Sequence, residues 1–427
     1  MASIEELKSA IADREEDMRR EFNEGNIVER ELQLPKNQPA KGVVNIIAGP
    51  RRAGKSIFAF QLCTGKKFGY VNFEDERLNV DGSELNRVLE AVYSLKGRTD
   101  LLIFDEIQNI DGWERFITRL SPAHKIIITG SNARLMSKDL ATFLTGRHID
   151  YELFPFSFRE YLLYTNKKFQ NTDITLTERR AQMYNLLNKY VREGGFPLSV
   201  KLGRQLLLDL YKDIIERDIL AKNHVKYSAK LRELSKYLIS NYSSEISYNK
   251  LSNIFGIKGN HTVANWIQYI RNAYLIFTLE RFSYKLKEQS MAPKKIYCID
   301  TGMINAIAFR SSEDRGRMME NLVAIELLRR RGYLHNSTEI YYWKDHSQNE
   351  VDFVVKKARK VIQLIQVTYA SDKKGIENRE LGSLAKASKE LHCKDLLVIS
   401  WDYDDVIRHS DAEVKIQSIL RWLLSPI

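Results

Sequence analysis

The stretch that decides the fold is Gly49-Pro50-Arg51-Arg52-Ala53-Gly54-Lys55-Ser56, in a chain of 427 residues. It fits the pattern Gly-x-x-x-x-Gly-Lys-Ser/Thr, whose glycines let backbone N–H groups curl around phosphate groups. A β-branched run at 43–47 predicts a strand directly before it, and the apolar residues from Ile57 predict a helix after it. This context predicts a phosphate-binding loop (P-loop) at 49–57, in which Lys55 reaches the outer phosphates and Ser56 ligates Mg²⁺.

A second acidic element lies downstream. Leu101-Leu-Ile-Phe-Asp-Glu106 is an apolar strand that ends in two carboxylates. Because a parallel sheet brings strand ends to one edge, these carboxylates are predicted to lie beside the P-loop. Asp105 is predicted to hold Mg²⁺, and Glu106 to polarise the attacking water.

Further polar candidates follow the strand at 125–129. Ser131 or Asn132 is predicted to sense the γ-phosphate or to orient the water, and a simple polar turn is the alternative. Arg147, after the loop Lys138–Thr145, is a candidate for a cation that reaches the nucleotide of a neighbouring subunit. A plain surface arginine is the alternative, and Arg134 and Arg217 are rival candidates for the same role. The predicted catalytic set is Lys55, Glu106, Asn132 and Arg147.

Alternation of strands and helices predicts a parallel α/β sheet around the P-loop. The predicted strands are 43–47, 68–73, 101–104 and 125–129, and the predicted helices are 57–65, 82–96 and 112–120. An acidic amphipathic helix is predicted at 4–34, suited to packing on a neighbouring subunit or covering a basic surface. From about residue 157 the pattern is helical, and from Lys294 it is mixed α/β, with strand-like runs at 296–299, 340–343, 351–355, 364–367 and 396–400.

Composition places limits on function. The hydrophobic share is 44%, and no apolar run reaches the length that a membrane span needs. The first residues do not resemble a secretory signal, and Cys63, Cys298 and Cys393 lack paired spacing. A cytoplasmic protein with reduced, buried cysteines and no membrane partner is therefore expected, and the scattered histidines make a zinc site unexpected.

The charge is unevenly distributed. Residues 1–40 carry six Lys and Arg against ten Asp and Glu, whereas the chain as a whole has a net charge of +11. The remainder is therefore strongly basic, which is compatible with a nucleic-acid partner. A solvated basic surface without a partner is the alternative interpretation.

The P-loop and the acidic strand end, in this order along the chain, resemble those of a family of AAA-type ATPases of archaea and bacteria. These ATPases carry a C-terminal domain of unknown function with a restriction-nuclease-like core. Other matching motifs are Tyr70–Leu78, Ile128–Leu135, Leu144–Arg147, Leu153–Tyr161, Gly194–Pro197 and Tyr211–Asp218. The resemblance covers nearly the whole chain. It implies an α/β multidomain protein with these parts: an acidic helix and linker (1–40), a P-loop ATPase core with a parallel sheet (41–155), a helical lid (156–227), a winged helix (228–290) and a restriction-endonuclease-like domain (291–427).

The winged-helix candidate contains two predicted helices joined by a short glycine-containing turn. In a helix-turn-helix the second helix enters the major groove with its first residues foremost. The predicted DNA-contact residues are Lys258, Asn260, His261, Thr262 and Arg271. A helical adaptor for another protein is the alternative, and Trp266, Ile270 and Leu275 are predicted to be core.

The resemblance also implies a nuclease site with acidic metal ligands and a lysine. Here Glu320, Glu350 and Asp352 match the acidic positions, but Gln366 and Thr368 stand where glutamate and lysine are expected. We therefore predict a degenerate site without nuclease activity. The surrounding region is rich in Lys and Arg, including Arg329, which predicts a basic surface able to bind phosphates.

The resulting prediction is an oligomeric ATPase, with a hexamer as one expectation, that uses ATP and Mg²⁺ to act on DNA. Branched or unpaired DNA is the favoured substrate. Three alternatives stay open: a nucleotide-switched regulatory ATPase that acts on a protein partner, an active magnesium-dependent nuclease, and a transcription regulator.

Overall fold

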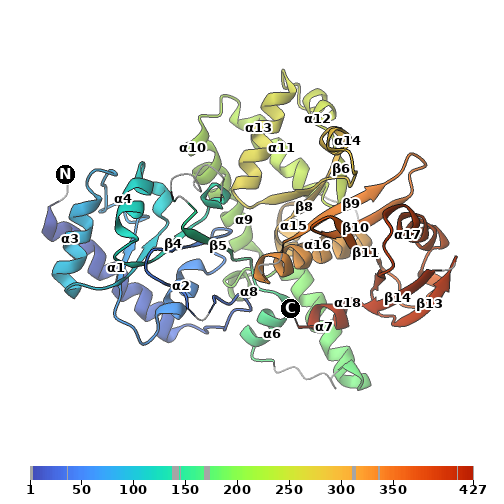
Figure 1. Ribbon diagram of the computed structural model, residues 1–427, viewed down its shortest axis with the longest axis horizontal. Helices are drawn as coiled ribbons and strands as arrows, with labels where there is room; N and C mark the ends of the chain where they lie inside the picture. Colours follow the sequence, from blue (N-terminus) through green and yellow to red (C-terminus); the bar gives the residue numbers. More distant parts are fainter. Residues whose placement is uncertain are drawn as a thin grey trace. The chain divides into compact units, whose positions relative to one another are not determined.

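The computed structural model describes residues 3–35, 37–136, 144, 146–167, 174–309, 314–334, 337–410 and 412–426 (Figure 1). These residues form two compact units. The first comprises Met1–Pro155 and Asn272–Tyr274, and the second comprises Phe156–Arg271 and Leu275–Ile427. Within the described residues, no helix is both long and apolar enough to span a membrane.

The first unit is built on a five-stranded parallel sheet of order β2-β3-β4-β1-β5. Its strands are β1 (Val44–Ala48), β2 (Gly69–Asn72), β3 (Leu101–Asp105), β4 (Lys125–Gly130) and β5 (His148–Glu152). The first four were predicted, because their apolar runs are buried. The sequence did not predict β5, which is an edge strand with only one fully buried residue, Tyr151.

Helices cover this sheet. They are α2 (Lys55–Cys63), α3 (Leu85–Lys96) and α4 (Trp113–Leu120). The short 3₁₀ turn η1 (Ile107–Asn109) lies between β3 and α4, and a second, η2 (Ala133–Met136), follows β4. Their apolar faces and the strands make one core that includes Val88, Phe104 and Ile128. Every strand of this parallel sheet ends at the same edge, so the loops that carry chemistry meet there.

The N-terminal helix α1 (Ile4–Glu24) is shorter than the predicted 4–34. Ser3 and Glu6 form a capping box at its start, and the chain leaves the helix at Gly25. The helix packs against α3 and β2 of its own unit, with Leu7 and Ile11 in the core. The apolar face of α1 is therefore used within its own unit, and its packing on a neighbouring subunit or over a basic surface stays a prediction.

The second unit begins with helices. They are α6 (Phe158–Tyr164), α7 (Thr177–Glu193), α8 (Ser199–Leu202), α9 (Arg204–Asp213), the π-helix η4 (Ile214–Leu220) and α10 (Ala221–Asn223). Helices α7 and α9 pack against α15 (Thr301–Ile307). The predicted lid segment, 156–227, thus belongs to the second compact unit.

A three-stranded antiparallel sheet of order β6-β8-β7 follows. In chain order its elements are α11 (Ser228–Ser240), β6 (Ser244–Ile246), α12 (Tyr248–Ile254), α13 (Asn260–Asn272), β7 (Ile276–Leu279), α14 (Leu286–Met291) and β8 (Lys294–Cys298). The sequence assigned the β8 strand to the C-terminal mixed α/β region. Its hydrogen bonds place it at the centre of this sheet instead, so that assignment is corrected. Trp266, Ile270 and Leu275 are buried, as predicted.

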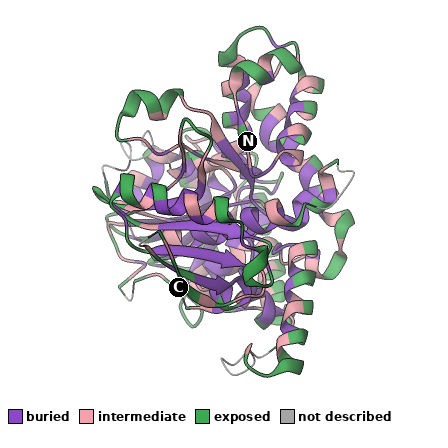
Figure 2. Ribbon diagram, turned by 90° about the vertical axis from the view of Figure 1, so that its right-hand side faces the viewer, coloured by how far each residue is buried: buried purple, intermediate pink, exposed green. Residues whose placement is uncertain are grey.

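The C-terminal part is a six-stranded mixed sheet of order β13-β14-β12-β11-β10-β9. Its strands are β9 (Thr338–Lys344), β10 (Glu350–Lys357), β11 (Lys360–Thr368), β12 (Leu396–Ser400), β13 (Asp405–His409) and β14 (Ala412–Ser418), and its helices are α16 (Arg315–Tyr333), α17 (Asn378–Leu391) and α18 (Ile419–Leu424). Helix α16 is buried on all sides from Met318 to Arg329, whereas α17 buries one face and exposes the other. Buried strands and partly exposed helices can be followed by colour in Figure 2. The whole is an α/β multidomain fold in which a P-loop-type parallel sheet precedes a mixed-sheet domain.

Candidate functional site

The P-loop residues 49–57 connect β1 to α2, as predicted. Glycine is required at position 49 because a Cβ atom there would lie 2.1 Å from the carbonyl oxygen of Leu153. Gly54 has a φ of 93°, a left-handed conformation that precedes the first turn of α2. Lys55 is buried, and its Nζ donates a hydrogen bond to the carbonyl of Pro50 at 3.0 Å. The loop is therefore preorganised with its lysine folded inward.

Asp105 lies at the end of β3 and accepts three side-chain hydrogen bonds. Their donors are the hydroxyls of Ser56 (3.0 Å), Tyr70 (2.7 Å) and Thr129. Burial raises the pKa of Asp105 above its usual range, and these hydrogen bonds oppose the shift. The pairing of Ser56 with Asp105 places a hydroxyl and a carboxylate oxygen together, which is an oxygen donor set that suits Mg²⁺.

Glu106 occupies a left-handed backbone conformation, with a φ of 53°. Non-glycine residues rarely adopt it, and such strain clusters at functional sites. Its carboxylate lies 3.3 Å from Lys55 Nζ and accepts hydrogen bonds from the side chain of Gln108 and the backbone of Ser131. Burial works to raise the pKa of Glu106, but the ammonium of Lys55 and the hydrogen bonds outweigh it and lower that pKa to about 2. This carboxylate is therefore ionised at neutral pH, and its pairing with Lys55 makes it a weak base in this state.

The structure brings Ser131 to the site and gives Asn132 a different local contact. The N–H of Ser131 donates to Glu106 at 3.0 Å. The side chain of Asn132 accepts a hydrogen bond from the backbone of Arg134, at the start of η2. Asn132 is half-buried, so its role as a sensor stays a prediction.

Arg147 is exposed and lies directly before β5. Of the preceding loop, Lys138–Thr145, only Leu144 is within the described residues. The rival Arg134 is exposed in η2, and Arg217 is exposed in η4, with its Nε 3.7 Å from Asp213. The choice among these arginines stays a prediction.

Three residues of the site were missed from the sequence. Tyr70 and Thr129 come from β2 and β4, the two strands that flank β3, and a signal existed because both lie near the ends of their strands. Arg30 is buried and donates to the carbonyls of Ala53 (3.0 Å) and Phe154 (2.6 Å), bracing the P-loop from outside. It lies outside any regular element, and nothing in the sequence pattern indicated it.

Residues 41–162 match a family model described as an AAA domain. The chain also shares 35% identity over 393 residues with the uncharacterized protein MJ1544 of Methanocaldococcus jannaschii. The match covers 89% of this chain and 86% of that protein. The chain belongs to the AAA-type P-loop ATPases. Its membership accounts for the site: a P-loop, an acidic strand end and a polar third strand end on one sheet edge.

Two further segments of this ATPase match family models of domains whose function is unknown. Residues 184–314 match the domain of unknown function DUF8612, and residues 315–420 match DUF4143. An uncharacterized protein of Haemophilus influenzae is 26% identical over 346 residues, covering 76% of this chain and 82% of that protein.

Two solved structures are similar at low identity. They are the Walker-type ATPase PABY2304 of Pyrococcus abyssi (16% identity, 69% of this chain, 95% of that chain, TM-score 0.32) and a DNA replication initiation factor (18% identity, 62% of this chain, 88% of that chain, TM-score 0.20).

Four of the five predicted DNA-contact residues of this ATPase lie at or just before the start of α13. Lys258, Asn260 and His261 are exposed, Thr262 is half-buried, and Arg271 lies at the far end of the helix. Arg271 donates to Gln268 of the same helix at 3.2 Å. The first four residues thus form one accessible end, which Arg271 does not share.

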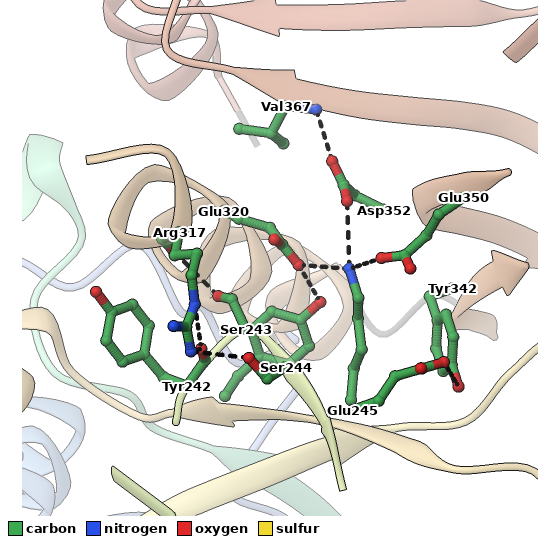
Figure 3. Close-up of polar contacts among 12 residues, drawn as sticks. Tyr242, Ser243, Ser244, Glu245, Arg317, Glu320, Tyr342, Glu350, Asp352 and Val367 are labelled. Atoms are coloured by element: carbon green, nitrogen blue, oxygen red, sulfur yellow. Dashed lines mark hydrogen bonds and ion pairs between the residues drawn. The ribbon is translucent and has the colours of Figure 1, made fainter. Parts of the chain in front are cut away.

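In the C-terminal domain, the structure brings Glu320 of α16 and Glu350 and Asp352 of β10 together (Figure 3). The point where they meet holds the ammonium of Lys295, a residue of β8 that the sequence reading did not single out. Burial opposes the charged form of Lys295, but the carboxylates outweigh it and hold its pKa well above the ordinary value. Burial raises the pKa of Glu320 to about 7, against the opposing charge of Lys295.

The two neutral positions of the predicted nuclease site are also buried. Gln366 and Thr368 lie on β11, next to β10. The backbone N–H of Val367, between them, donates to Asp352 at 2.9 Å. The expectation of a basic surface in this region is wrong for one residue. Arg329 is buried and paired with Glu326, so it is unavailable to phosphates.

Proposed function

We propose that this ATPase works as an oligomer that binds ATP and Mg²⁺ at the P-loop and uses hydrolysis to remodel, or move on, DNA. Branched or unpaired DNA is the favoured substrate. The observation that carries the DNA role is the accessible polar end of α13 within a strongly basic module.

The nucleotide part follows from the site. Lys55 would leave Pro50 to bind the outer phosphates, and Ser56 and Asp105 would hold Mg²⁺. Bound Mg²⁺ would neutralise charge on the phosphates. Glu106 would accept a proton from the attacking water, because its carboxylate stays ionised at neutral pH. Ser131 and Asn132 follow β4, which lies between β3 and β1, and either would sense the γ-phosphate or orient the water.

An oligomer is supported by the position of Arg147. It is exposed and directly precedes the edge strand β5. An arginine supplied in trans stabilises charge on the transferring phosphoryl group. Arg147 would therefore serve the ATP of a neighbouring subunit.

A DNA role is supported by topology and charge. Along the chain, helices α12 and α13 lie between β6 and β7, and these strands form a sheet of order β6-β8-β7. This arrangement is typical of winged helices. Residues 228–298 contain eleven Lys and Arg against four Asp and Glu, a net charge of +7. Such an excess favours binding to the phosphate backbone, and the first residues of α13 are those that a recognition helix presents to DNA.

The test is the rate of ATP hydrolysis without DNA and with duplex, single-stranded and four-way-junction DNA of equal nucleotide content. Lys55→Ala is the control for contaminating ATPases. Stimulation of the wild-type rate several-fold, strongest with the junction, is the expected result. If none of the DNAs changes the rate of ATP hydrolysis and none binds the protein at moderate salt, the DNA role is contradicted. That result would favour a regulatory ATPase with a protein partner.

A further inference from the structure

The C-terminal acidic cluster is organised around a lysine. Nζ of Lys295 lies 2.9 Å from Glu320, 2.5 Å from Glu350 and 3.2 Å from Asp352, and the lysine side chain is only 4% exposed (Figure 3). An ammonium group has three N–H donors, and here each faces a different carboxylate. The ammonium therefore fills the point at which the three side chains converge.

Each carboxylate is also held by a second partner. These contacts are the Tyr297 hydroxyl to Glu320 (2.7 Å), the Val367 N–H to Asp352 (2.9 Å) and the Lys344 ammonium to Glu350 (3.2 Å). The oxygens are thus directed at fixed donors of the protein rather than at a common vacant point. In such a cluster, the negative charge of three carboxylates is already compensated in part by the ammonium groups of Lys295 and Lys344.

This arrangement does not fit a divalent metal ion. Mg²⁺ requires oxygen ligands at about 2.0–2.1 Å in octahedral geometry and usually keeps several waters. A buried ammonium at the centre would repel the ion and occupy its volume. Within the described residues, no group of three or more His, Cys, Asp or Glu side chains is arranged to hold a metal. The residues present therefore do not suit the metal of a restriction-type nuclease.

The cluster also joins separate parts of the second unit. Lys295 belongs to the central strand of the three-stranded sheet, whereas the carboxylates belong to α16 and β10. Neighbouring contacts span the same junction (Figure 3): Arg317 Nε donates to the carbonyl of Tyr242 at 3.0 Å, and Tyr342 donates to Glu245 at 3.0 Å. The Lys295 cluster lies within this polar junction.

We propose that Lys295 is the permanent cation of this cluster, standing in for a divalent metal ion, and that the cluster fastens the three-stranded sheet to the six-stranded domain instead of cutting phosphodiesters. Gln366 and Thr368 of β11 stand where the family resemblance implies glutamate and lysine, which is consistent with a site whose cation comes from β8. Removing the ammonium would expose a divalent-cation site that the wild type lacks.

The experiment compares Mn²⁺ binding by the wild type, Lys295→Met and Lys344→Met, using titration followed by the electron paramagnetic resonance of free Mn²⁺. Lys344→Met is the matched control, because it removes an ammonium from the same Glu350 but leaves Lys295 in place. Lys295→Met is expected to bind one more Mn²⁺ per chain than the wild type. Lys344→Met is expected to bind the same number of Mn²⁺ ions as the wild type. Adding Asp352→Asn to Lys295→Met should abolish the extra site.

Thermal unfolding gives a second readout. Lys295→Met should melt lower by roughly 5–10 °C, because a buried charge cluster loses its counter-ion, and Mn²⁺ should restore much of the loss. A folded Lys295→Met without extra Mn²⁺ binding overturns the proposal. So does Asp352-dependent Mn²⁺ binding by the wild type, a measurement that stays decisive even if Lys295→Met does not fold.

Discussion

The ammonium of Lys55 and the carboxylate of Glu106 form a buried ion pair with an Nζ–Oε1 distance of 3.3 Å. One partner belongs to the P-loop and the other to the end of β3, so the proposed phosphate-binding group and the proposed water-activating group are coupled. When phosphates compete for Lys55, Glu106 loses the charge that does most to lower its pKa. Nucleotide binding would thereby make Glu106 a stronger base at the moment when one is needed.

Glu106→Gln should separate binding from chemistry. The amide cannot accept a proton, so hydrolysis is expected to fall by about 100-fold or more, whereas ATP binding should persist. Steady-state phosphate release and equilibrium binding of a fluorescent ATP analogue measure the two effects. Glu74→Gln is the control, because Glu74 pairs with Arg51 on the outside of the loop at 2.7 Å. Equal activities of the two variants would contradict the assignment.

Thr129→Val should weaken the use of magnesium. The hydroxyl of Thr129 donates to Asp105 and accepts from the N–H of Glu106 at 3.1 Å, and valine has nearly the same shape without either bond. We expect the Mg²⁺ concentration for half-maximal ATPase rate to rise by about tenfold, as for the loss of a hydrogen bond to a charged group. Thr118→Val, which removes a hydroxyl that donates to the carbonyl of Glu114 within α4, is the control and should behave as the wild type.

Gly194→Ala should destabilise the second unit far more than Gly203→Ala. Both glycines have positive φ, 80° and 73°, with ψ of −173° and −160°, a conformation nearly restricted to glycine, so alanine at either position costs about 1–3 kcal/mol. A Cβ at Gly194 would also lie 2.1 Å from Oδ1 of Asp300, whereas nothing lies within 4 Å of one at Gly203. The additional cost at Gly194 should exceed about 2 kcal/mol in urea unfolding. Equal losses would show that the chain shifts freely around Asp300.

Titration of Asp300 should lower the free energy of unfolding as the pH rises. It caps α15 and accepts a hydrogen bond from the N–H of Gly195 at 2.7 Å, but burial dominates and raises its pKa from 3.8 to about 6. The folded state therefore holds this proton more tightly, and the free energy of unfolding should decline by up to about 3 kcal/mol between about pH 4 and pH 6.

Asp300→Asn cannot titrate, so subtracting its unfolding curve from that of the wild type isolates this decline. The relevant measurement is urea unfolding of both proteins at several pH values between 4 and 7. A difference that stays constant over this range would refute the assignment.

Lys258→Ala should weaken DNA binding without loss of ATP binding. If Lys258 contacts a phosphate, the slope of log affinity against log salt concentration should fall by about 1, equally for all sequences. Lys389→Ala removes the same charge from the exposed face of α17 and is the control. Identical salt slopes for both variants would remove α13 from the proposed interface.

How much of the fold the sequence could predict depended on burial. Strands β1, β3 and β4 are apolar and buried, so their runs stand out, and Glu106 and Lys55 follow directly from the loops attached to them. β13 alternates half-buried with exposed residues, as edge strands do, and no apolar run marked it. The predicted N-terminal helix was too long because its apolar spacing continued past Gly25.

The missed site residues share a different cause. Tyr70, Thr129 and Lys295 act on carboxylates of other strands or helices, and such proximity depends on sheet order. The order β2-β3-β4-β1-β5 does not follow chain order, and β8 lies between β6 and β7. One sequence gives the elements, but only tertiary structure shows which of them are neighbours.

The position of Lys295 has a consequence for how such chains can recombine in evolution. The residues that match DUF8612 end at 314, and those that match DUF4143 begin at 315. Lys295 lies in the first segment, and Glu320, Glu350 and Asp352 lie in the second. A gene fusion joined between 314 and 315 would inherit the acids without their cation, unless its new upstream half brought a lysine to the same place. The two segments should therefore be inherited as a pair.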